Sequence, residues 1–338
     1  MHVKLVIQIP CFNEEEVLGE TLAALPRSVP GFDSVETLII DDGSSDDTVG
    51  AARRAGATYL LRFPVHLGLA RAFEAGLDAA LKLGADVIVN TDADNQYRGA
   101  DVPLLVQPIL AGQADMVIGD RTPHRLRRFG PGKRLLQRIG SWVVRQVSGT
   151  RVPDAASGFR AFSRRAALRL NVFTEFTYTL ETIIQAGMKH IAIAHVAIET
   201  NPERRPSRLF RRMTFYVRRS IATLVRIYAL YEPLKVFWRI GATCIAIGGV
   251  IGARFLYYYL TRGGTGHVQS LILGAVLLIV GFQTLLIGLV ADLIGASRSL
   301  QEDTLVRVRE IELRLGDGPD VERLEPAVEE RPARRAPP

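Results

Sequence analysis

The chain has 338 residues, 48% of them hydrophobic, and a formal net charge of +7. This length fits one medium-sized domain with additional elements, and the apolar residues concentrate between 237 and 294 rather than spreading evenly. The cysteines, Cys11 and Cys244, are too few for a disulfide framework or a zinc site built on cysteine.

Short apolar runs alternate with helical patterns over about the first 120 residues. Residues 1–10 read as a strand rather than a signal peptide, so we expect the N-terminal domain to stay in the cytosol. Strands are predicted at 3–9, 36–40, 57–61, 86–90 and 114–119, and helices at 14–25, 46–55, 67–83 and 101–111. Strict alternation predicts an α/β fold, with a mostly parallel, Rossmann-like sheet between two layers of helices. Ligands of such sheets bind beyond the carboxyl ends of the strands.

The second half of the chain changes character. Residues 121–165 are arginine-rich and predicted to be irregular, and a helix at 178–188, a strand at 191–199 and a polar loop ending at Ser207 follow. A helix at 208–231 then carries apolar side chains on one face and six arginines on the other. This pattern is typical of a helix lying in a membrane interface. The alternative is a helix packed on the soluble domain with a solvated basic face.

Two apolar stretches, 237–260 and 269–293, are each long enough to span a bilayer. Lysine and arginine crowd their outer flanks, so both ends are expected in the cytoplasm. Gly248 and Gly252 favour close helix packing, either within the hairpin or between subunits of a homo-oligomer. A charged helix is predicted at 300–315, and the residues after it, rich in Pro, Glu and Arg, are expected to be disordered.

These elements divide the chain into five parts and predict a multi-pass protein of the cell (inner) membrane with a cytoplasmic α/β domain. The parts are the α/β domain (1–207), an amphipathic juxtamembrane helix (208–235), a two-helix transmembrane hairpin (236–294), a cytosolic helix (295–315) and a disordered tail (316–338).

Asp92, Asp94 and Gln96 follow the buried-strand pattern of residues 87–89 at a spacing of two. Carboxylate and amide oxygens are ligands that suit Mg²⁺ or Mn²⁺. Such an ion would share its ligand shell with phosphate oxygens and offset the charge of a diphosphate leaving group. The alternative is a helix-capping turn with solvated acids.

Two more polar motifs follow predicted strands. Residues 41–48 place Asp41 and Asp42 where acids can bind a ribose or a base edge, while Ser45 or Asp46 can cap the next helix. Residues 10–14 form the third motif, which is also consistent with a simple strand-to-helix turn.

Together these motifs resemble glycosyltransferase family 2, which has the GT-A fold. The matching residues are Pro10, Phe12, Asn13 and Glu14, then Asp41 to Ser44 with Asp46 and Thr48, then Gly68 and Gly76, then Asp92, Asp94 and Gln96. Residues 154–161 look like the D-x-x-S-G-F-R-A segment of the dolichol-phosphate mannose synthase branch, and residues 205–209 like a variant of its R…S-K-L loop. The two C-terminal spans resemble those of bacterial polyprenyl-phosphate glucosyltransferases. His66 replaces the Asn usual before Leu-Gly, and Arg208 replaces the usual Lys.

The resemblance implies roles for individual residues. The nucleotide would be held by Pro10, Phe12, Asn13, Glu14, Asp41 and Asp42. Asp92 would lie by the ribose, the donor sugar or the metal, and Asp94 and Gln96 would ligate the metal. Arg121, Arg134 and the loop of Ser207 and Arg208 would meet the lipid phosphate and the diphosphate. Asp94, Arg121 and Arg134 are the residues expected to act in catalysis.

The expected reaction moves a hexose from a UDP- or GDP-linked sugar to a polyprenyl phosphate, with undecaprenyl phosphate favoured; the resemblance implies inversion. A phosphate monoester is already ionised at neutral pH, so it needs no general base, and catalysis reduces to positioning and charge stabilisation. This agrees with an arginine-rich second half. A hydroxyl acceptor would instead require a carboxylate base. Glu181 is the candidate, with an exposed helix acid as its alternative.

Other functions remain open. One is a family 2 transferase that acts on a hydroxyl of a glycolipid or polysaccharide, and another is a non-catalytic scaffold that binds a nucleotide-sugar. A processive polysaccharide synthase would carry a Q-x-x-R-W motif, which residues 137–142 do not match, and more membrane spans. We expect no nucleic-acid partner, because the arginines adjoin a membrane helix and lack interleaved aromatics. The expected partners are therefore the nucleotide-sugar, the polyprenyl phosphate and membrane lipids.

Overall fold

The computed structural model describes residues 2–121, 149–150, 152–172, 178–202, 233–263, 268–316, 318 and 321–324. The chain divides into two compact units, one formed by 1–220 with 306–338 and the other by 221–305. The amphipathic helix predicted at 208–231 lies outside the described residues.

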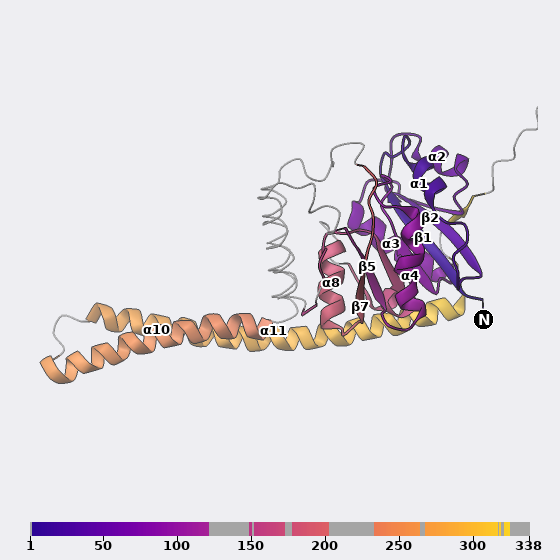
Figure 1. Ribbon diagram of the computed structural model, residues 1–338. Helices are drawn as coiled ribbons and strands as arrows, with labels where there is room; N and C mark the ends of the chain where they lie inside the picture. Colours follow the sequence, from indigo (N-terminus) through magenta and orange to yellow (C-terminus); the bar gives the residue numbers. More distant parts are fainter. Residues whose placement is uncertain are drawn as a thin grey trace, which may run out of the picture. The chain divides into compact units, whose positions relative to one another are not determined.

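The described part of the first unit is built on an eight-stranded sheet in the order β7-β5-β6-β4-β1-β2-β3-β8 (Figure 1). The strands are β1 (Lys4–Cys11), β2 (Ser34–Asp41), β3 (Tyr59–Arg62), β4 (Val87–Asn90), β5 (Met116–Asp120), β6 (Arg160–Ser163), β7 (Ile193–Ala197) and β8 (Glu322–Arg323). β1 lies between β2 and β4 and is parallel to both, whereas β6 and β8 run antiparallel to their neighbours. The sheet is therefore mostly parallel, as predicted.

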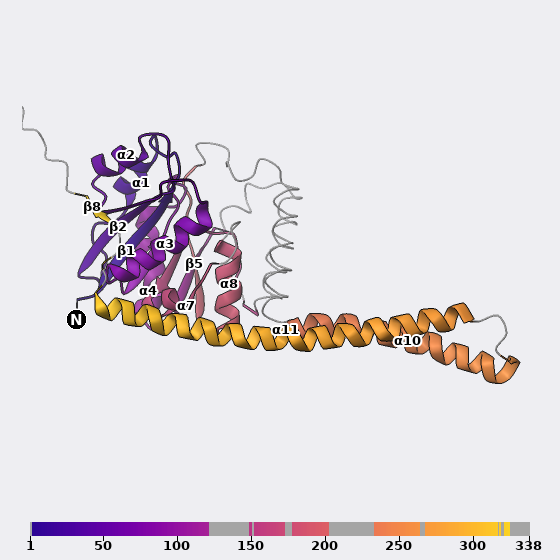
Figure 2. The same ribbon diagram turned by 180° about the vertical axis from the view of Figure 1, so that it is seen from behind.

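Helices cover both faces of this sheet. They are α1 (Leu18–Ala24), α2 (Thr48–Arg54), α3 (Leu69–Lys82), the short 3-10 helix η1 (Gly99–Asp101), α4 (Val102–Leu110), α7 (Arg164–Arg169) and α8 (Tyr178–Met188). The odd-numbered side chains of β1, such as Ile7, pack in one core with α1 and α4. On the other face α3 approaches closely at Gly76, where an added Cβ would lie 2.6 Å from Gln8 Oε1 (Figure 2). The result is the predicted helix–sheet–helix arrangement.

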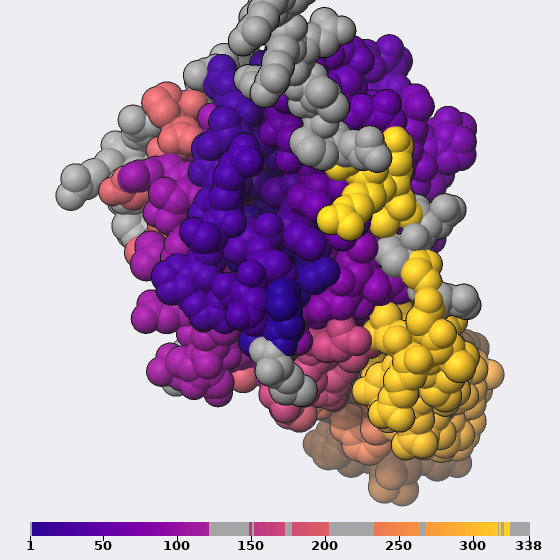
Figure 3. All heavy atoms as spheres, turned by 90° about the vertical axis from the view of Figure 1, so that its right-hand side faces the viewer, coloured from indigo at the N-terminus to yellow at the C-terminus, as the bar shows by residue number. Residues whose placement is uncertain are grey.

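Two of the sequence predictions for the first unit are wrong. The segment 121–165 is not irregular throughout, because β6 and the start of α7 lie in it. The tail 316–338 is not wholly disordered, because β8 pairs with β3 and Leu324 is buried in the core. In Figure 3 the yellow residues of this C-terminal strand lie against the N-terminal part of the sheet.

The helix predicted at 14–25 begins later, at Leu18. Asn13 has a φ of 54°, and the amides of Glu14 and Glu15 donate to the side chains of Thr48 and Asp46 rather than remaining free at a helix start. Residues 13–17 therefore form a turn that is held by the loop after β2.

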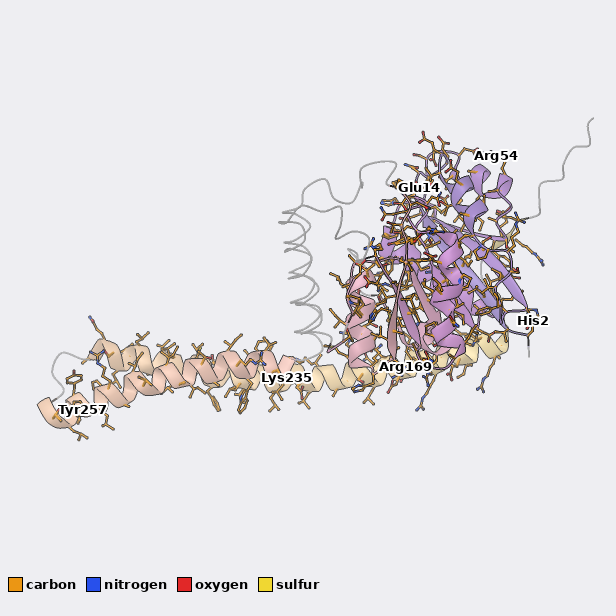
Figure 4. All side chains as sticks on the ribbon, viewed as in Figure 1. His2, Glu14, Arg54, Arg169, Lys235 and Tyr257 are labelled. Atoms are coloured by element: carbon orange, nitrogen blue, oxygen red, sulfur yellow. The ribbon has the colours of Figure 1, made fainter. Side chains whose placement is uncertain are left out.

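The second unit contains α10 (Pro233–Arg262) and most of α11 (Val268–Leu315). Both are long and apolar enough to cross a membrane, and only 11% and 17% of their most apolar windows are buried. The predicted separate helix at 300–315 is instead a continuation of α11. Figure 4 labels Lys235 near the start of α10 and Tyr257 near its end.

Glycines form the contact between the two apolar helices. A Cβ added to Gly241 would lie 2.8 Å from the carbonyl oxygen of Gly281, and one on Gly248 would lie 3.0 Å from that of Gly274. Gly248 thus packs within the hairpin, as one of the two predicted arrangements requires. Gly252 has no atom within 4 Å of its own added Cβ, but its backbone nitrogen lies 3.6 Å from a Cβ added to Gly274, so it borders this contact.

Candidate active site

The polar motifs meet at one edge of the first unit's sheet. β1, β2, β4 and β5 are parallel and end at the same edge, so the loops that follow them lie together. Figure 4 shows Glu14, which follows β1, at this edge and Arg169, at the end of α7, at the opposite edge. The sheet therefore gathers the predicted site residues that the structure describes.

The loops after β1 and β2 are interlocked by hydrogen bonds. The Asn13 amide donates to Ser44 Oγ at 2.9 Å, and the Ser45 amide donates to Asn13 Oδ1 at 2.8 Å. The Glu14 amide donates to Thr48 Oγ1 at 2.9 Å. Asn13 and Glu14 therefore hold the loops after β1 and β2 together, in addition to the nucleotide contacts that the sequence predicts for them.

Asp41 and Asp42 are buried, and their carboxylates bind neighbouring loops. Asp41 accepts the Ser44 amide at 3.0 Å and lies 3.3 Å from Arg62 Nε. Asp42 accepts the amides of Leu67 and Gly68 at 2.7 and 2.9 Å, just where α3 begins. Both acids are predicted to bind the nucleotide, and their oxygens also fix the loops that border the site.

An exposed aromatic pair borders these loops. The rings of Phe12 and His66 stack with centroids 3.9 Å apart, and His66 Nδ1 lies 2.8 Å from Asp42 Oδ2. Pro10, by contrast, is buried within β1 opposite Ile40. Of the predicted nucleotide residues, Phe12 is therefore placed to meet a ligand and Pro10 to support the strand.

The loop after β4 carries the predicted metal ligands. Asp94 is exposed, and its Oδ1 accepts the Gln96 amide at 3.1 Å. Asn95, with a φ of 54°, turns the chain back. Asn201 holds the loop from outside, since its side chain donates to the Asn95 carbonyl at 2.8 Å and its amide to the Gln96 carbonyl at 2.9 Å. The loop is thus fixed before any ligand binds.

Asp92 stands in an environment that disfavours its charge. Burial, followed by repulsion from Asp94, raises the pKa of Asp92 to about 7, while Arg121 and a hydrogen bond from Tyr97 act in the opposite direction. Two mutually repelling carboxylates fit a divalent cation, which would relieve the repulsion. Among the residues that the structure describes, no group of three or more His, Cys, Asp or Glu side chains is placed to hold a metal ion.

Behind Asp92 lies a buried ion pair. Arg121 Nε and Nη2 donate to the two carboxylate oxygens of Asp154 at 2.7 and 3.1 Å, and Nη1 donates to the Tyr97 hydroxyl at 3.1 Å. Only 6% of the Arg121 side chain is exposed. Arg121 was predicted to meet phosphate, and the structure places it instead behind the carboxylate of the site. Sequence reasoning did not single out Tyr97.

A second buried arginine orders the segment that leads into β6. Arg160 donates to the carbonyls of Ser157, Thr179 and Ala155 at 2.7, 2.8 and 2.9 Å, and burial lowers its pKa to about 10. This arginine belongs to the S-G-F-R-A segment. Its bonds join the segment to α8 through Thr179. The residues at 154–161 that carry the family resemblance therefore hold this segment and α8 together beside the site.

Glu181 of α8 is buried, with 2% of its surface exposed, so the alternative of an exposed helix acid is wrong. Its Oε1 accepts a hydrogen bond from Gln185 Nε2 at 3.3 Å. Arg134, Ser207 and Arg208 lie outside the described residues, and their predicted phosphate contacts remain predictions.

Known proteins resemble this chain over the same region. The model for glycosyl transferase family 2 matches residues 6–170. An uncharacterized glycosyltransferase of Mycobacterium tuberculosis is 30% identical over 199 residues, which cover 59% of this chain and 85% of that protein. An undecaprenyl-phosphate mannosyltransferase of Micrococcus luteus is 30% identical over 166 residues, 47% of this chain and 66% of the relative. A UDP-N-acetylglucosamine–dolichyl-phosphate N-acetylglucosaminyltransferase of Methanococcus voltae is 27% identical over 216 residues, 57% and 83% of the two chains.

A solved structure has the same fold. It is glucosyl-3-phosphoglycerate synthase of Mycobacterium tuberculosis in complex with Mn²⁺, UDP-glucose and phosphoglyceric acid, and it matches with a TM-score of 0.53 and 23% identity. The match covers 67% of this chain and 80% of that chain. At this identity the likeness shows the fold alone, and it confirms the predicted GT-A architecture.

Proposed function

The chain belongs to glycosyltransferase family 2, and from this membership we propose that it transfers a hexose from a UDP- or GDP-linked sugar to a polyprenyl phosphate. Undecaprenyl phosphate is the favoured acceptor, and the reaction inverts the anomeric centre and depends on Mg²⁺ or Mn²⁺. The protein is a multi-pass protein of the cell (inner) membrane, with the α/β domain in the cytoplasm and a product that serves envelope glycan synthesis.

The observation that carries the proposal is the oxygen-ligand set of Asp92, Asp94 and Gln96 at the carboxyl edge of the sheet. Two relatives named above act on lipid phosphates, undecaprenyl phosphate in one and dolichyl phosphate in the other, but transfer different sugars. This supports the acceptor class and leaves the sugar open. The exposed apolar surfaces of α10 and α11 support an acceptor that lies in a membrane.

The chemistry follows from the acceptor. An ionised phosphate oxygen attacks the anomeric carbon, the bond from that carbon to the diphosphate breaks, and no proton has to be removed from the nucleophile. When bound, a divalent cation would offset the charge that builds on the departing diphosphate. Asp92, Asp94 and Gln96 would hold it, and the Phe12–His66 pair with the Asn13 loop would receive the nucleotide. Arg134, Ser207 and Arg208 are proposed to contact the two phosphate groups.

Arg121 contributes differently from the contact first predicted. Its guanidinium is bound by Asp154 and Tyr97 and has little exposed surface. We therefore assign its catalytic contribution to a buried positive charge behind Asp92, which favours the ionised carboxylate.

The proposal is tested by offering the purified full-length chain a panel of UDP- and GDP-sugars with undecaprenyl phosphate and Mg²⁺ or Mn²⁺. Labelled sugar should enter the organic phase with one donor and stay in the aqueous phase when EDTA is added. Transfer to a hydroxyl acceptor alone would overturn the lipid-phosphate assignment. Nucleotide-sugar binding without any transfer would indicate the scaffold.

A further inference from the structure

The Tyr97 hydroxyl has one proton, and its surroundings determine where that proton points. Its oxygen accepts the Gly158 amide at 2.9 Å and Arg121 Nη1 at 3.1 Å. With both acceptor positions used, the hydroxyl can act toward a third group only as a donor. The Asp92 carboxylate lies against the same glycine, since a Cβ added to Gly158 would be 2.8 Å from Asp92 Oδ1, and this carboxylate is the acceptor of the Tyr97 hydrogen bond.

From this geometry we infer that Tyr97 is a positioning residue, which holds the Asp92 carboxylate in place for the divalent cation and the nucleotide diphosphate. The inference rests on the proposed function, because it concerns the same site. Tyr97 is not a catalytic residue, since it acts through Asp92.

Tyr97 is itself fixed on three sides. Its ring stacks on that of Phe159 with centroids 5.1 Å apart, its backbone forms a bridge with Thr200, and the Arg121 guanidinium lies 5.6 Å from the ring centroid. Arg121 is in turn fixed by its two bonds to Asp154. The hydroxyl is therefore preorganised, and its hydrogen bond to Asp92 costs little side-chain entropy when a ligand binds.

Gly158 also restricts Asp92. A Cβ added to Gly158 would lie 2.8 Å from Asp92 Oδ1 and 2.9 Å from the Tyr178 hydroxyl. Asp92 is thus packed against the Gly158 backbone and bonded by Tyr97, which leaves it little freedom to turn away. Partners that orient a metal-binding carboxylate in this way commonly affect metal affinity 10- to 100-fold, in round figures.

The test is Tyr97→Phe, which keeps the ring and its stacking and removes the hydroxyl. Isothermal titration calorimetry in the presence of UDP should show a Mn²⁺ Kd raised about tenfold or more. The rate of sugar transfer should fall at low Mn²⁺ and recover at high Mn²⁺, while KM for the polyprenyl phosphate stays the same. A purely structural role for the hydroxyl would not be rescued by Mn²⁺.

Ser163→Ala is the matched control. It removes a partly buried hydroxyl that caps α7 at the edge of the sheet opposite the candidate site. It should lower Tm and leave the Mn²⁺ Kd unchanged. A Tyr97→Phe variant with the Mn²⁺ Kd of the unmodified protein would overturn the inference and leave the proposed function intact. Absence of Mn²⁺ binding in the unmodified protein would instead remove the metal assignment of the proposed function.

Discussion

Asp92 and Asp94 are two residues apart and have different environments. Asp92 is partly buried and bonded by Tyr97, whereas Asp94 is exposed and bonded only to the Gln96 amide among the contacts described. Asp94 can therefore be changed with little effect on folding.

We expect Asp94→Asn to lower kcat by at least about 100-fold, because loss of one preorganised charge at a developing anion has effects of that size. Tm should change by about 1 °C or less, since substitutions of exposed side chains rarely affect stability. Labelled-sugar transfer and thermal unfolding measure the two quantities. Asp78→Asn, at a half-buried acid of α3 that pairs with Lys82, is the control and should retain full activity. Full activity in Asp94→Asn would contradict the metal assignment.

Gly158 is the second residue whose replacement should act on the site. The Cβ of Gly158→Ala would meet Asp92 Oδ1 at 2.8 Å and the Tyr178 hydroxyl at 2.9 Å, so the carboxylate must move. We expect weaker Mn²⁺ binding and at least about tenfold slower transfer, as for other disturbances around a metal ligand. Gly19→Ala, in α1 with nothing within 4 Å of the added Cβ, is the matched control and should be neutral or slightly stabilising. Equal activity of the two variants would show that Asp92 tolerates displacement.

For individual residues, sequence patterns predict the motifs but not the residues that hold those motifs in place. Asp92, Asp94 and Gln96 are visible because acids at a spacing of two after an apolar run form a local pattern. Tyr97 is not, because its importance comes from a contact across 61 positions of the chain, and Gly158 is marked only through the family resemblance at 154–161. The partner of Arg121, Asp154, is likewise 33 positions away, so no local pattern indicates that the two residues pair.

The secondary-structure elements also differ in whether a local sequence pattern predicts them. β1, β2 and β4 were predicted because long buried parallel strands read as apolar runs. β8 consists of Glu322 and Arg323 and has no apolar pattern of its own. It exists because the Leu324 amide donates to the Thr58 carbonyl at 2.9 Å and the Leu324 side chain enters the core. Tertiary contacts of this kind leave no periodic signal.

Leu324 should therefore contribute to the stability of the α/β domain, although it lies far along the chain from the other core residues. Leu324→Ala is expected to lower the free energy of unfolding by about 2 kcal/mol. Tm should fall by roughly 4–8 °C for a domain of this size. Thermal unfolding of the full-length protein in detergent measures the change. Glu322→Gln is the control, since its exposed ion pair with Arg53 should contribute less than about 1 kcal/mol. Equal effects of both variants would argue against a core role for Leu324.

At the scale of the whole molecule, the chain leaves the first unit and returns to it. Residues 306–338 belong to the same unit as residues 1–220. Arg309, on the last turns of α11, donates from Nη1 to the carbonyls of Leu168 and Leu170 at the end of α7, each at 3.3 Å. Simple truncation after residue 235 would therefore remove Arg309 and Leu324 as well as the apolar helices, and would destabilise the domain whose activity is to be measured.

An internal replacement separates membrane attachment from folding. We propose to exchange residues 236–305 for a flexible Gly/Ser linker of about 30 residues, which has an r.m.s. end-to-end distance of about 30 Å. Because the docked segment from Val306 onward is retained, the variant should keep its Tm and bind UDP with Mn²⁺ as the full-length protein does. High salt should release it from the membrane fraction, because the exposed apolar surfaces of α10 and α11 are gone and only the basic helix predicted at 208–231 is left to bind the membrane surface.

The decisive comparison is between two acceptors. With undecaprenyl phosphate in vesicles at high salt, which detaches the basic helix predicted at 208–231, the linker variant should lose at least about 90% of its transfer rate, because enzyme and acceptor no longer share one surface and the effective concentration falls. With a short, water-soluble prenyl phosphate the variant and the full-length protein should have similar rates, since the reacting groups are the same. Equal rates on vesicles would contradict the anchoring role of the apolar helices. Loss of activity on the soluble acceptor would instead mean that residues 236–305 contribute to the site itself.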